Sequence, residues 1–209
     1  MTRRIAGPRL GCLIGILALA VAAASAQDAG VREPDAYRTQ DYRAPTPATL
    51  KGARVITTGE AATLWRDGSA AFIDVLPQAP RPAGLPPGTI WRDKPRLDIP
   101  GSIWLPDTGY GELASVTEDY FRKGLEHATG ADRSKILVFY CLKDCWMSWN
   151  AAKRALAMGY ANVAWFPDGS DGWQEVGLPQ AEAQPAAGRP GLNPATVGSP
   201  APAQTGAAR

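Results

Sequence analysis

The feature that most constrains this fold is the alternation of short apolar runs with helical patterns. Lys135–Tyr140 is apolar and β-branched enough for a central strand, and Ser148–Met158 has the pattern of a helix that ends at Gly159. Asn162–Phe166 is again apolar and predicts the next strand. Strands that alternate with helices imply right-handed crossovers and a sheet covered on both faces. The sequence therefore predicts an α/β fold with a central, mainly parallel sheet and helices on both faces.

Further elements of the same two kinds are expected earlier in the chain. The expected strands are Val55–Thr57, Ala71–Val75 and Ser102–Leu105. The expected helices are Glu60–Arg66, with Thr58 as its candidate N-cap, and Thr117–Thr129, which Gly130 would end. Residues 77–100 form a proline-rich excursion, and Asp168 and Asp171 are interpreted first as turn formers.

Composition divides the chain into four segments. Residues 1–26 precede the mature protein, as argued below, and residues 27–53 are polar and predict an extended N-terminal arm. Residues 54–179 hold the expected strands and helices and form the globular domain. Residues 180–209 are rich in Ala, Pro and Gly with almost no large apolar side chain. Because such a segment cannot bury enough surface to offset its ordering entropy, we expect a disordered tail.

The N-terminus has the layout of a secretory signal peptide. The basic segment Met1–Arg9 is followed by the uncharged run Leu10–Ala24 and by the small residues Ala24-Ser-Ala26. We therefore expect export, with a mature protein that begins at or near Gln27. The alternative is a retained membrane anchor, although the apolar run is shorter than the roughly 20 residues that a spanning helix needs. Cys12 lies too early in this run for lipoprotein processing.

The charge of the mature chain excludes two classes of partner. Cleavage removes three arginines, which leaves 19 basic side chains against 20 acidic ones and no basic block. Nucleic acid and the membrane surface therefore have no electrostatic support as main partners once the signal is cleaved.

Cleavage also leaves only two cysteines, Cys141 and Cys145. In an oxidising compartment such a pair can form a structural disulfide. A disulfide that closes so short a loop restricts the unfolded chain very little, however. The spacing therefore favours a chemical or redox role for both cysteines.

The loop that holds these cysteines joins the expected central strand to a helix. Sites in such sheets form at the carboxyl ends of the strands, where Cys141 stands. Free N–H groups at the start of the helix would stabilise a thiolate, and Lys143 would add positive charge. The alternative is that Cys141 is a buried cysteine without chemistry. The remaining candidates in this loop are Asp144, Trp146, Ser148 and Trp149.

The sequence predicts neither a metal nor a cofactor. Covalent haem needs a histidine directly after the second cysteine, where Trp146 stands. A closed zinc site needs four good ligands, whereas this chain offers two thiols and the single His127.

The tryptophans allow two interpretations. Trp146 and Trp149 flank the expected helix start, Trp91 and Trp104 bracket the proline-rich excursion, and Trp173 follows the glycine turn. They could line a pocket for an alcohol, a quinone or a loop of a partner protein. Alternatively they fill the core and the loops, with Trp146 as the expected exception.

Six segments taken in order resemble the rhodanese domain. They are Phe72-Ile-Asp-Val75, Ile99-Pro-Gly-Ser102, Ile136-Leu-Val-Phe-Tyr-Cys141, Gly159-Tyr-Ala-Asn-Val163, Asp168-Gly-Ser-Asp-Gly-Trp173 and Gly177-Leu-Pro179. The resemblance implies an α/β fold with a central parallel sheet, a nucleophilic Cys141 and a structural Asp74. Active sulfurtransferases of this family carry a glycine and an arginine in the loop, where this chain has Asp144 and Trp146. We therefore expect thiosulfate sulfurtransfer to be weak or absent.

A closer resemblance covers Cys141 to Ala155. The run Cys-x-x-x-Cys-Trp-Met-Ser-Trp-Asn-Ala-Ala-Lys-Arg-Ala is similar to the PQQ-dependent catabolism-associated CXXCW motif proteins. That family implies an exported, periplasmic, rhodanese-like protein with redox or quinoprotein alcohol-oxidation components as partners. The resemblance supplies no mechanism and does not imply that this chain binds PQQ.

Two hypotheses of different classes follow. In the first, Cys141 attacks and Cys145 resolves, as a thiol redox pair or as carriers of a persulfide, so the protein is a rhodanese-like sulfurtransferase or a thiol redox protein. In the second, the protein is a non-catalytic accessory module that binds a periplasmic partner or ligand through a Trp-rich mouth. The sequence leaves open whether the chain is an enzyme.

Overall fold

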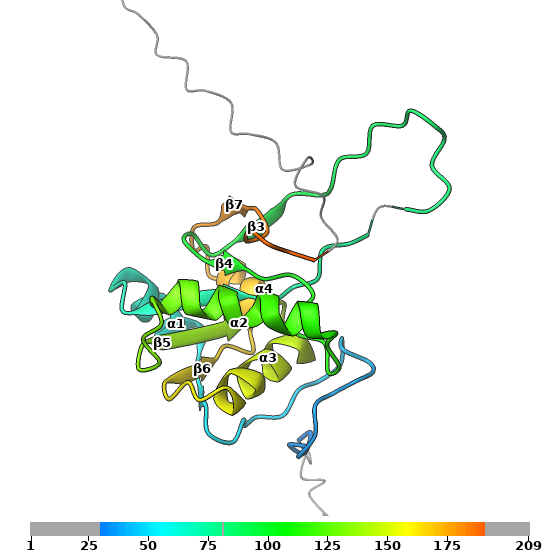
Figure 1. The fold of residues 1–209 in the computed structure, drawn as a ribbon. Coiled ribbons are helices and arrows are strands. Elements are labelled where there is room, and N and C mark those ends of the chain that lie inside the picture. Colours follow the sequence, from blue (N-terminus) through cyan, green and yellow to red (C-terminus); the bar gives the residue numbers. More distant parts are fainter. Residues whose placement is uncertain (1–29, 81, 191–209) are drawn as a thin grey trace, which may run out of the picture.

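The computed structural model of the chain describes residues 30–80 and 82–190. Figure 1 shows a central sheet with helices packed on it and a long projecting segment before β3. The strands are β1 (Arg54–Val55), β2 (Ala70–Asp74), β3 (Arg96–Asp98), β4 (Ile103–Trp104), β5 (Ile136–Tyr140), β6 (Val163–Trp165) and β7 (Ala181–Ala183). The helices are α1 (Thr58–Arg66), α2 (Ser115–Thr129), α3 (Trp146–Ala157) and α4 (Gly169–Glu175).

The central sheet has five parallel strands in the order β1-β6-β5-β2-β4. β5 lies in the middle, and every residue of it after Ile136 is buried. Such burial on both faces is the reason that this strand is a continuous apolar run in the sequence. The predicted α/β fold with a central parallel sheet is therefore confirmed.

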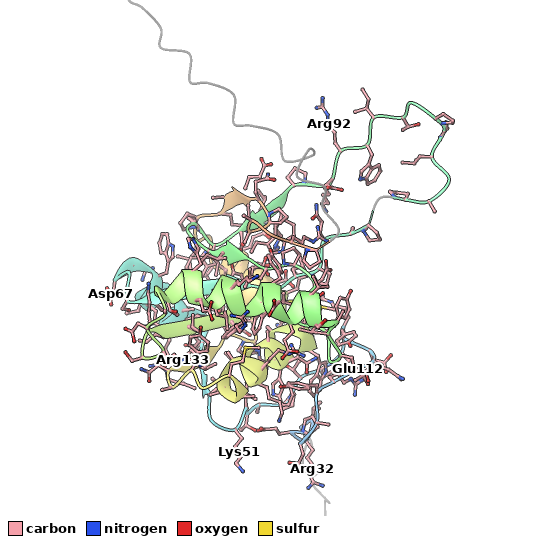
Figure 2. All side chains as sticks on the ribbon, in the orientation of Figure 1. Arg32, Lys51, Asp67, Arg92, Glu112 and Arg133 are labelled. Carbon is pink, nitrogen blue, oxygen red and sulfur yellow. A yellow bond between two sulfur atoms is a disulfide. The ribbon has the colours of Figure 1, made fainter. Side chains whose placement is uncertain are left out.

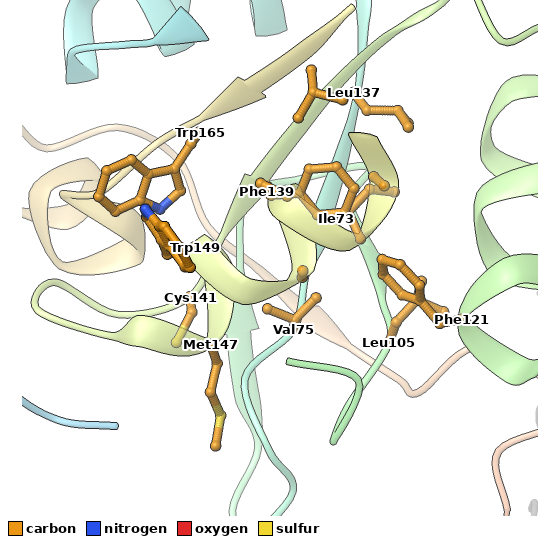
Figure 3. Close-up of a cluster of buried hydrophobic side chains, with 14 of the residues drawn as sticks. Ile73, Val75, Leu105, Phe121, Leu137, Phe139, Cys141, Met147, Trp149 and Trp165 are labelled. Carbon is orange, nitrogen blue, oxygen red and sulfur yellow. The ribbon is translucent and has the colours of Figure 1, made fainter. Parts of the chain in front are cut away.

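Alternate residues of β5 pack against different helices. Leu137 and Phe139 belong to a core with residues of α2 and α3, while Val138 and Tyr140 belong to a second core with residues of α1 and α4. Figure 3 shows the first of these cores, which also contains Cys141. Helices thus cover both faces of the sheet, as expected.

Three helix boundaries differ from the predicted ones. The N-cap of α1 is Thr57 and not Thr58, because the Thr57 side chain and Glu60 form a reciprocal capping box. α2 begins at Ser115, two residues earlier than expected, and ends at the left-handed Gly130 as predicted. α3 begins at Trp146, directly after the second cysteine, and not at Ser148.

The prediction of a disordered tail from residue 180 is wrong for residues 181–190. β7 pairs with β3 in a separate antiparallel sheet, and the backbone of Ala186 bonds to Trp104 at 2.8 Å. Backbone groups make these contacts. The prediction of disorder rested on the scarcity of large apolar side chains, and side-chain composition carries no information on backbone pairing. The proline-rich excursion correspondingly ends in a strand. The predicted signal peptide and residues 191–209 lie outside the described residues.

Charged side chains such as Lys51, Asp67 and Arg133 are exposed at the edges of the molecule (Figure 2). Within residues 30–80 and 82–190, no helix combines the length and the apolar character needed to cross a membrane.

Candidate functional site

The cysteine loop lies at the carboxyl end of the central strand. β5 ends at Tyr140, Cys141 follows directly, and Cys145 occupies the N-cap position of α3. The predicted position of Cys141 is therefore confirmed. The loop between the two elements consists of the five residues 141–145 alone, so both cysteines are held by regular structure on one side.

The two cysteines are joined in a disulfide, with their Cα atoms 6.3 Å apart. This separation falls within the limit of about 7 Å for a disulfide. The loop turns back on itself at Asp144, whose φ of 52° lies in the left-handed region. Aspartate tolerates that conformation better than most side chains, because its short polar group can bond locally.

Neither sulfur-bearing residue is open to solvent. Cys141 is 0 % exposed and Cys145 is 2 % exposed. Both belong to the core that includes Trp146 and Trp149 from the first turn of α3. An incoming reactant must therefore wait for a movement that uncovers one of the cysteines.

The N-terminal arm, residues 30–53, lies against this loop. Arg43 forms an isolated antiparallel β-bridge with Cys145. The Trp146 backbone N–H donates to the carbonyl of Tyr42 at 2.9 Å, and its indole Nε1 donates to the carbonyl of Pro45 at 3.1 Å. The arm is thus hydrogen-bonded to the chain at Cys145 and Trp146, directly beside the disulfide.

Asn150 fastens the arm to α3. Its Oδ1 accepts from the Arg38 N–H at 2.9 Å, and its Nδ2 donates to the Arg38 carbonyl at 2.8 Å and to the Gly109 carbonyl at 3.0 Å. Trp149 adds a bond from Nε1 to the Thr49 carbonyl at 3.1 Å. Sequence reasoning missed Asn150, since a polar residue in a helix carries no signal for a partner 112 positions away.

The opposite side of the loop is held by α4. The carbonyl of Cys141 accepts from the Ser170 N–H at 2.9 Å and from Ser170 Oγ at 3.2 Å. The Lys143 N–H donates to Asp171 Oδ2 at 3.1 Å. The interpretation of Asp171 as a turn former is wrong, because Asp171 lies in the first turn of α4, where it holds the cysteine loop.

The sequence model of the rhodanese-like domain matches residues 31–176, which is most of the chain. The chain belongs to the rhodanese-like domain family. The match includes the N-terminal arm, so the arm is part of the region related to the family.

Several solved structures resemble this rhodanese-like chain. One is the polysulfide-sulfur transferase homodimer from Wolinella succinogenes, at 17 % identity and a TM-score of 0.41 over 63 % of this chain and 80 % of that chain. A second is EanB in complex with ergothioneine, at 21 % identity and a TM-score of 0.45 over 68 % of this chain and 34 % of that chain. A third is the Rhodopseudomonas palustris protein RPA3614, described as a possible tyrosine phosphatase, at 22 % identity and a TM-score of 0.36 over 64 % of this chain and 98 % of that chain. No curated protein matches the sequence.

The side chains of the rhodanese-like loop offer no cationic clamp. Lys143 and Asp144 are both exposed, and the negative charge of Asp144 offsets the positive charge of Lys143. The N–H groups of Lys143 and Trp146 are already bonded to Asp171 and Tyr42. An anion at the sulfur would therefore find fewer donors than an open loop would provide.

The tryptophans of the loop do not line a pocket. Trp146 is 2 % exposed and Trp149 is 0 % exposed, with their ring centroids 5.4 Å apart. Ser148 is buried as well; its Oγ donates to the Cys145 carbonyl and accepts from Trp165 Nε1. These three residues are therefore covered in this structure, because the start of α3 is packed under the arm. Trp173 is buried as well.

A charged network lies next to the loop on the other face of β5. Arg96 Nε donates to Asp74 Oδ2 at 2.7 Å, and the hydroxyl of Tyr140 donates to Asp98. Burial, with a further contribution from Asp74, raises the pKa of Asp98 to about 7. Burial also raises the pKa of Asp74, although Arg96 opposes this shift.

The sequence predicted only one of the residues in this network. Asp74 stands at its strand end, where its Oδ1 accepts from the Leu76 N–H at 2.9 Å, as a structural residue would. Arg96 and Asp98 were missed, because they lie in a proline-rich segment where nothing indicates burial. Within the described residues, no group of three or more His, Cys, Asp or Glu side chains could hold a metal ion.

Proposed function

We propose that this rhodanese-like domain carries out thiol chemistry on the Cys141–Cys145 pair, as a redox protein or as a carrier of sulfane sulfur. The observation that supports this most strongly is the disulfide at the carboxyl end of the central strand. This disulfide closes a loop that is too short to restrict the unfolded chain appreciably. It therefore adds little to the stability of the fold, and a structural role does not account for its presence. Membership of the rhodanese-like family supports sulfur-transfer chemistry in general.

The positions of the cysteines suggest which of them reacts first. Cys145 occupies the N-cap of α3, where the positive end of the helix dipole favours a thiolate even though the Trp146 N–H is bonded to the Tyr42 carbonyl. Cys141 lies deeper, at the end of β5. We therefore propose that Cys145 attacks and Cys141 resolves, the reverse of the roles in the first sequence hypothesis, where Cys141 attacks and Cys145 resolves.

The proposed reaction balances in two steps. The Cys145 thiolate attacks a substrate disulfide, forms a mixed disulfide and releases one substrate thiolate. Cys141 then attacks the Cys145 sulfur, releases the second substrate thiolate and restores the disulfide, so the substrate gains two electrons. With a persulfide donor R–S–SH, the Cys145 thiolate would attack the outer sulfur, break the donor S–S bond and release the thiolate R–S⁻, which leaves a persulfide on Cys145. Attack by Cys141 on the Cys145 sulfur would then release hydrosulfide and form the disulfide.

Serine variants test this proposal. Treated with a disulfide substrate, reduced Cys141→Ser should accumulate a mixed disulfide on Cys145, which intact-mass measurement detects. Reduced Cys145→Ser should accumulate much less. If neither variant forms an adduct while both remain folded, the proposed chemistry is wrong and the accessory-module hypothesis takes its place.

The cellular setting is part of the proposal. The signal-like N-terminus and the resemblance to the CXXCW motif family support a periplasmic protein that serves quinoprotein alcohol oxidation. A mass spectrum of the protein from its native compartment would distinguish dithiol, disulfide and persulfide. Copurification of an alcohol-oxidising component that depends on the cysteines would support the partnership, and its absence from crosslinked material would argue against it.

A further inference from the structure

A cavity of about 630 Å³ opens beside the cysteine loop. Leu76, which follows β2, and Leu142, which follows β5, both line it. β2 and β5 are neighbours in the sheet, but the chain continues from β2 to β4 on one side and resumes at β5 on the other. Ligands of open α/β sheets bind at such a reversal of strand order, and the volume suits a small organic molecule.

The apolar wall of the cavity presents aromatic faces. Trp104 is 5 % exposed and its Nε1 donates to the Leu76 carbonyl at 2.7 Å. Trp91 is 41 % exposed and its Nε1 donates to Asp93 Oδ1 at 2.8 Å. Because both indole N–H groups are bonded within the protein, these residues offer a ligand ring surface, most of it on the exposed Trp91. Flat apolar groups are the complement of such surface.

The charged side chains that line the cavity differ in whether they already make hydrogen bonds within the protein. Asp93 accepts from Trp91 and from Gln78, and Asp171 accepts from the Lys143 N–H. Within residues 30–80 and 82–190, the side chains of Arg92 and Lys94 make no hydrogen bond or ion pair. Figure 2 places Arg92 on the projecting segment that precedes β3. In the described part of the chain, the lining carries three cations, Arg92, Lys94 and Arg96, against the two carboxylates Asp93 and Asp171. The carboxylates already accept hydrogen bonds, so the donors left for a ligand are those of Arg92 and Lys94.

We propose that this cavity binds an organic carboxylate with a flat aromatic body. The ring packs against Trp91 and Trp104, and the carboxylate meets Arg92 and Lys94. The floor is fixed by Arg96, which donates to Asp74 at 2.7 Å and to Ser170 Oγ at 3.1 Å. Ser170 in turn bonds the Cys141 carbonyl, so an occupied cavity adjoins the cysteine loop without involving sulfur chemistry.

A matched pair of probes tests the charge. 2-Naphthoate and its neutral analogue 2-naphthamide are titrated into the oxidised full-length protein, with the indole N–H signals followed by NMR. Naphthoate should shift the signals of Trp91 and Trp104 saturably and bind about tenfold more tightly than naphthamide, a preference that high salt removes.

Variants locate the site. Arg92→Gln with Lys94→Gln should weaken naphthoate about tenfold and leave naphthamide unchanged, whereas Trp91→Ala should weaken both probes. Lys51→Gln, at an exposed position on another face (Figure 2), should change neither. Equal affinity for the two probes, signals that shift only in other tryptophans, or no saturation with naphthoate would each overturn the proposal. No sulfur substrate is present, so the result does not depend on the thiol chemistry.

Discussion

Burial of Asp98 beside Asp74 makes the stability of the fold depend on protonation. The pKa of Asp98 rises from an ordinary 3.8 to about 7. Between about pH 4 and pH 7 the folded protein therefore holds a proton that the unfolded chain releases. Stability should fall as the pH rises through this window, and it should level off above about pH 7.

Asp98→Asn tests this directly. The amide oxygen can still accept from Tyr140, but the group no longer titrates. The loss of unfolding free energy between pH 5 and pH 7, measured by urea denaturation, should become less steep by up to about 1.4 kcal/mol per pH unit. Asp67→Asn, at an exposed residue after α1, is the control and should keep the steep slope. An unchanged slope in Asp98→Asn would show that the carboxyl is ionised throughout.

The two thiols should differ in reactivity once the disulfide is reduced. Cys145 at the N-cap of α3 should be alkylated by iodoacetamide first below neutral pH, while Cys141 at the end of β5 should follow more slowly. Peptide mapping after short labelling measures both rates. Faster labelling of Cys141 would restore the assignment suggested by the family resemblance.

At the scale of elements, the arm governs access to the disulfide. Asn150 holds both backbone groups of Arg38, so Asn150→Ala leaves these partly buried groups unpaired and should weaken docking of the arm by about 1 kcal/mol. Reduction of the disulfide by dithiothreitol should then become at least several-fold faster. Asn162→Ala is the matched control, because Asn162 bonds an exposed carbonyl of Ser134 away from the arm. Equal acceleration in both variants would indicate general loosening of the fold.

The cysteine loop as an element lacks what thiosulfate chemistry needs. No arginine lies between Cys141 and Trp149, and the N–H groups of Lys143 and Trp146 are already bonded. We therefore expect a thiosulfate:cyanide sulfurtransferase rate far below that of an ordinary rhodanese. The difference should be about 100-fold or more, because the loss of one charge-stabilising donor has an effect of that size. A rate comparable to an ordinary rhodanese, and abolished by Cys141→Ser, would contradict this.

At the scale of the whole molecule, the sequence predicted what depends on local pattern. The apolar run before Cys141 predicted a central strand, and the pattern after the loop predicted a helix. The structure confirms both elements. The docking of the arm and the pairing of β3 with β7 could not be predicted, because backbone groups make these contacts across long stretches of chain. The tryptophans were ambiguous because an indole suits a core as well as a pocket.

The last prediction concerns maturation of the whole chain. Leu10–Ala24 would be about 22 Å long as a helix, shorter than the roughly 30 Å of a bilayer core, and Ala24-Ser-Ala26 follows it. In a host with an export pathway, the soluble fraction should therefore contain a protein whose intact mass corresponds to a start at or near Gln27. Ala24→Leu with Ala26→Leu should block cleavage and leave the protein in the membrane fraction, whereas Ala29→Leu beyond the site should be processed normally. A wild-type protein that retains Met1–Ala26 and sediments with membranes would show that the segment is an anchor.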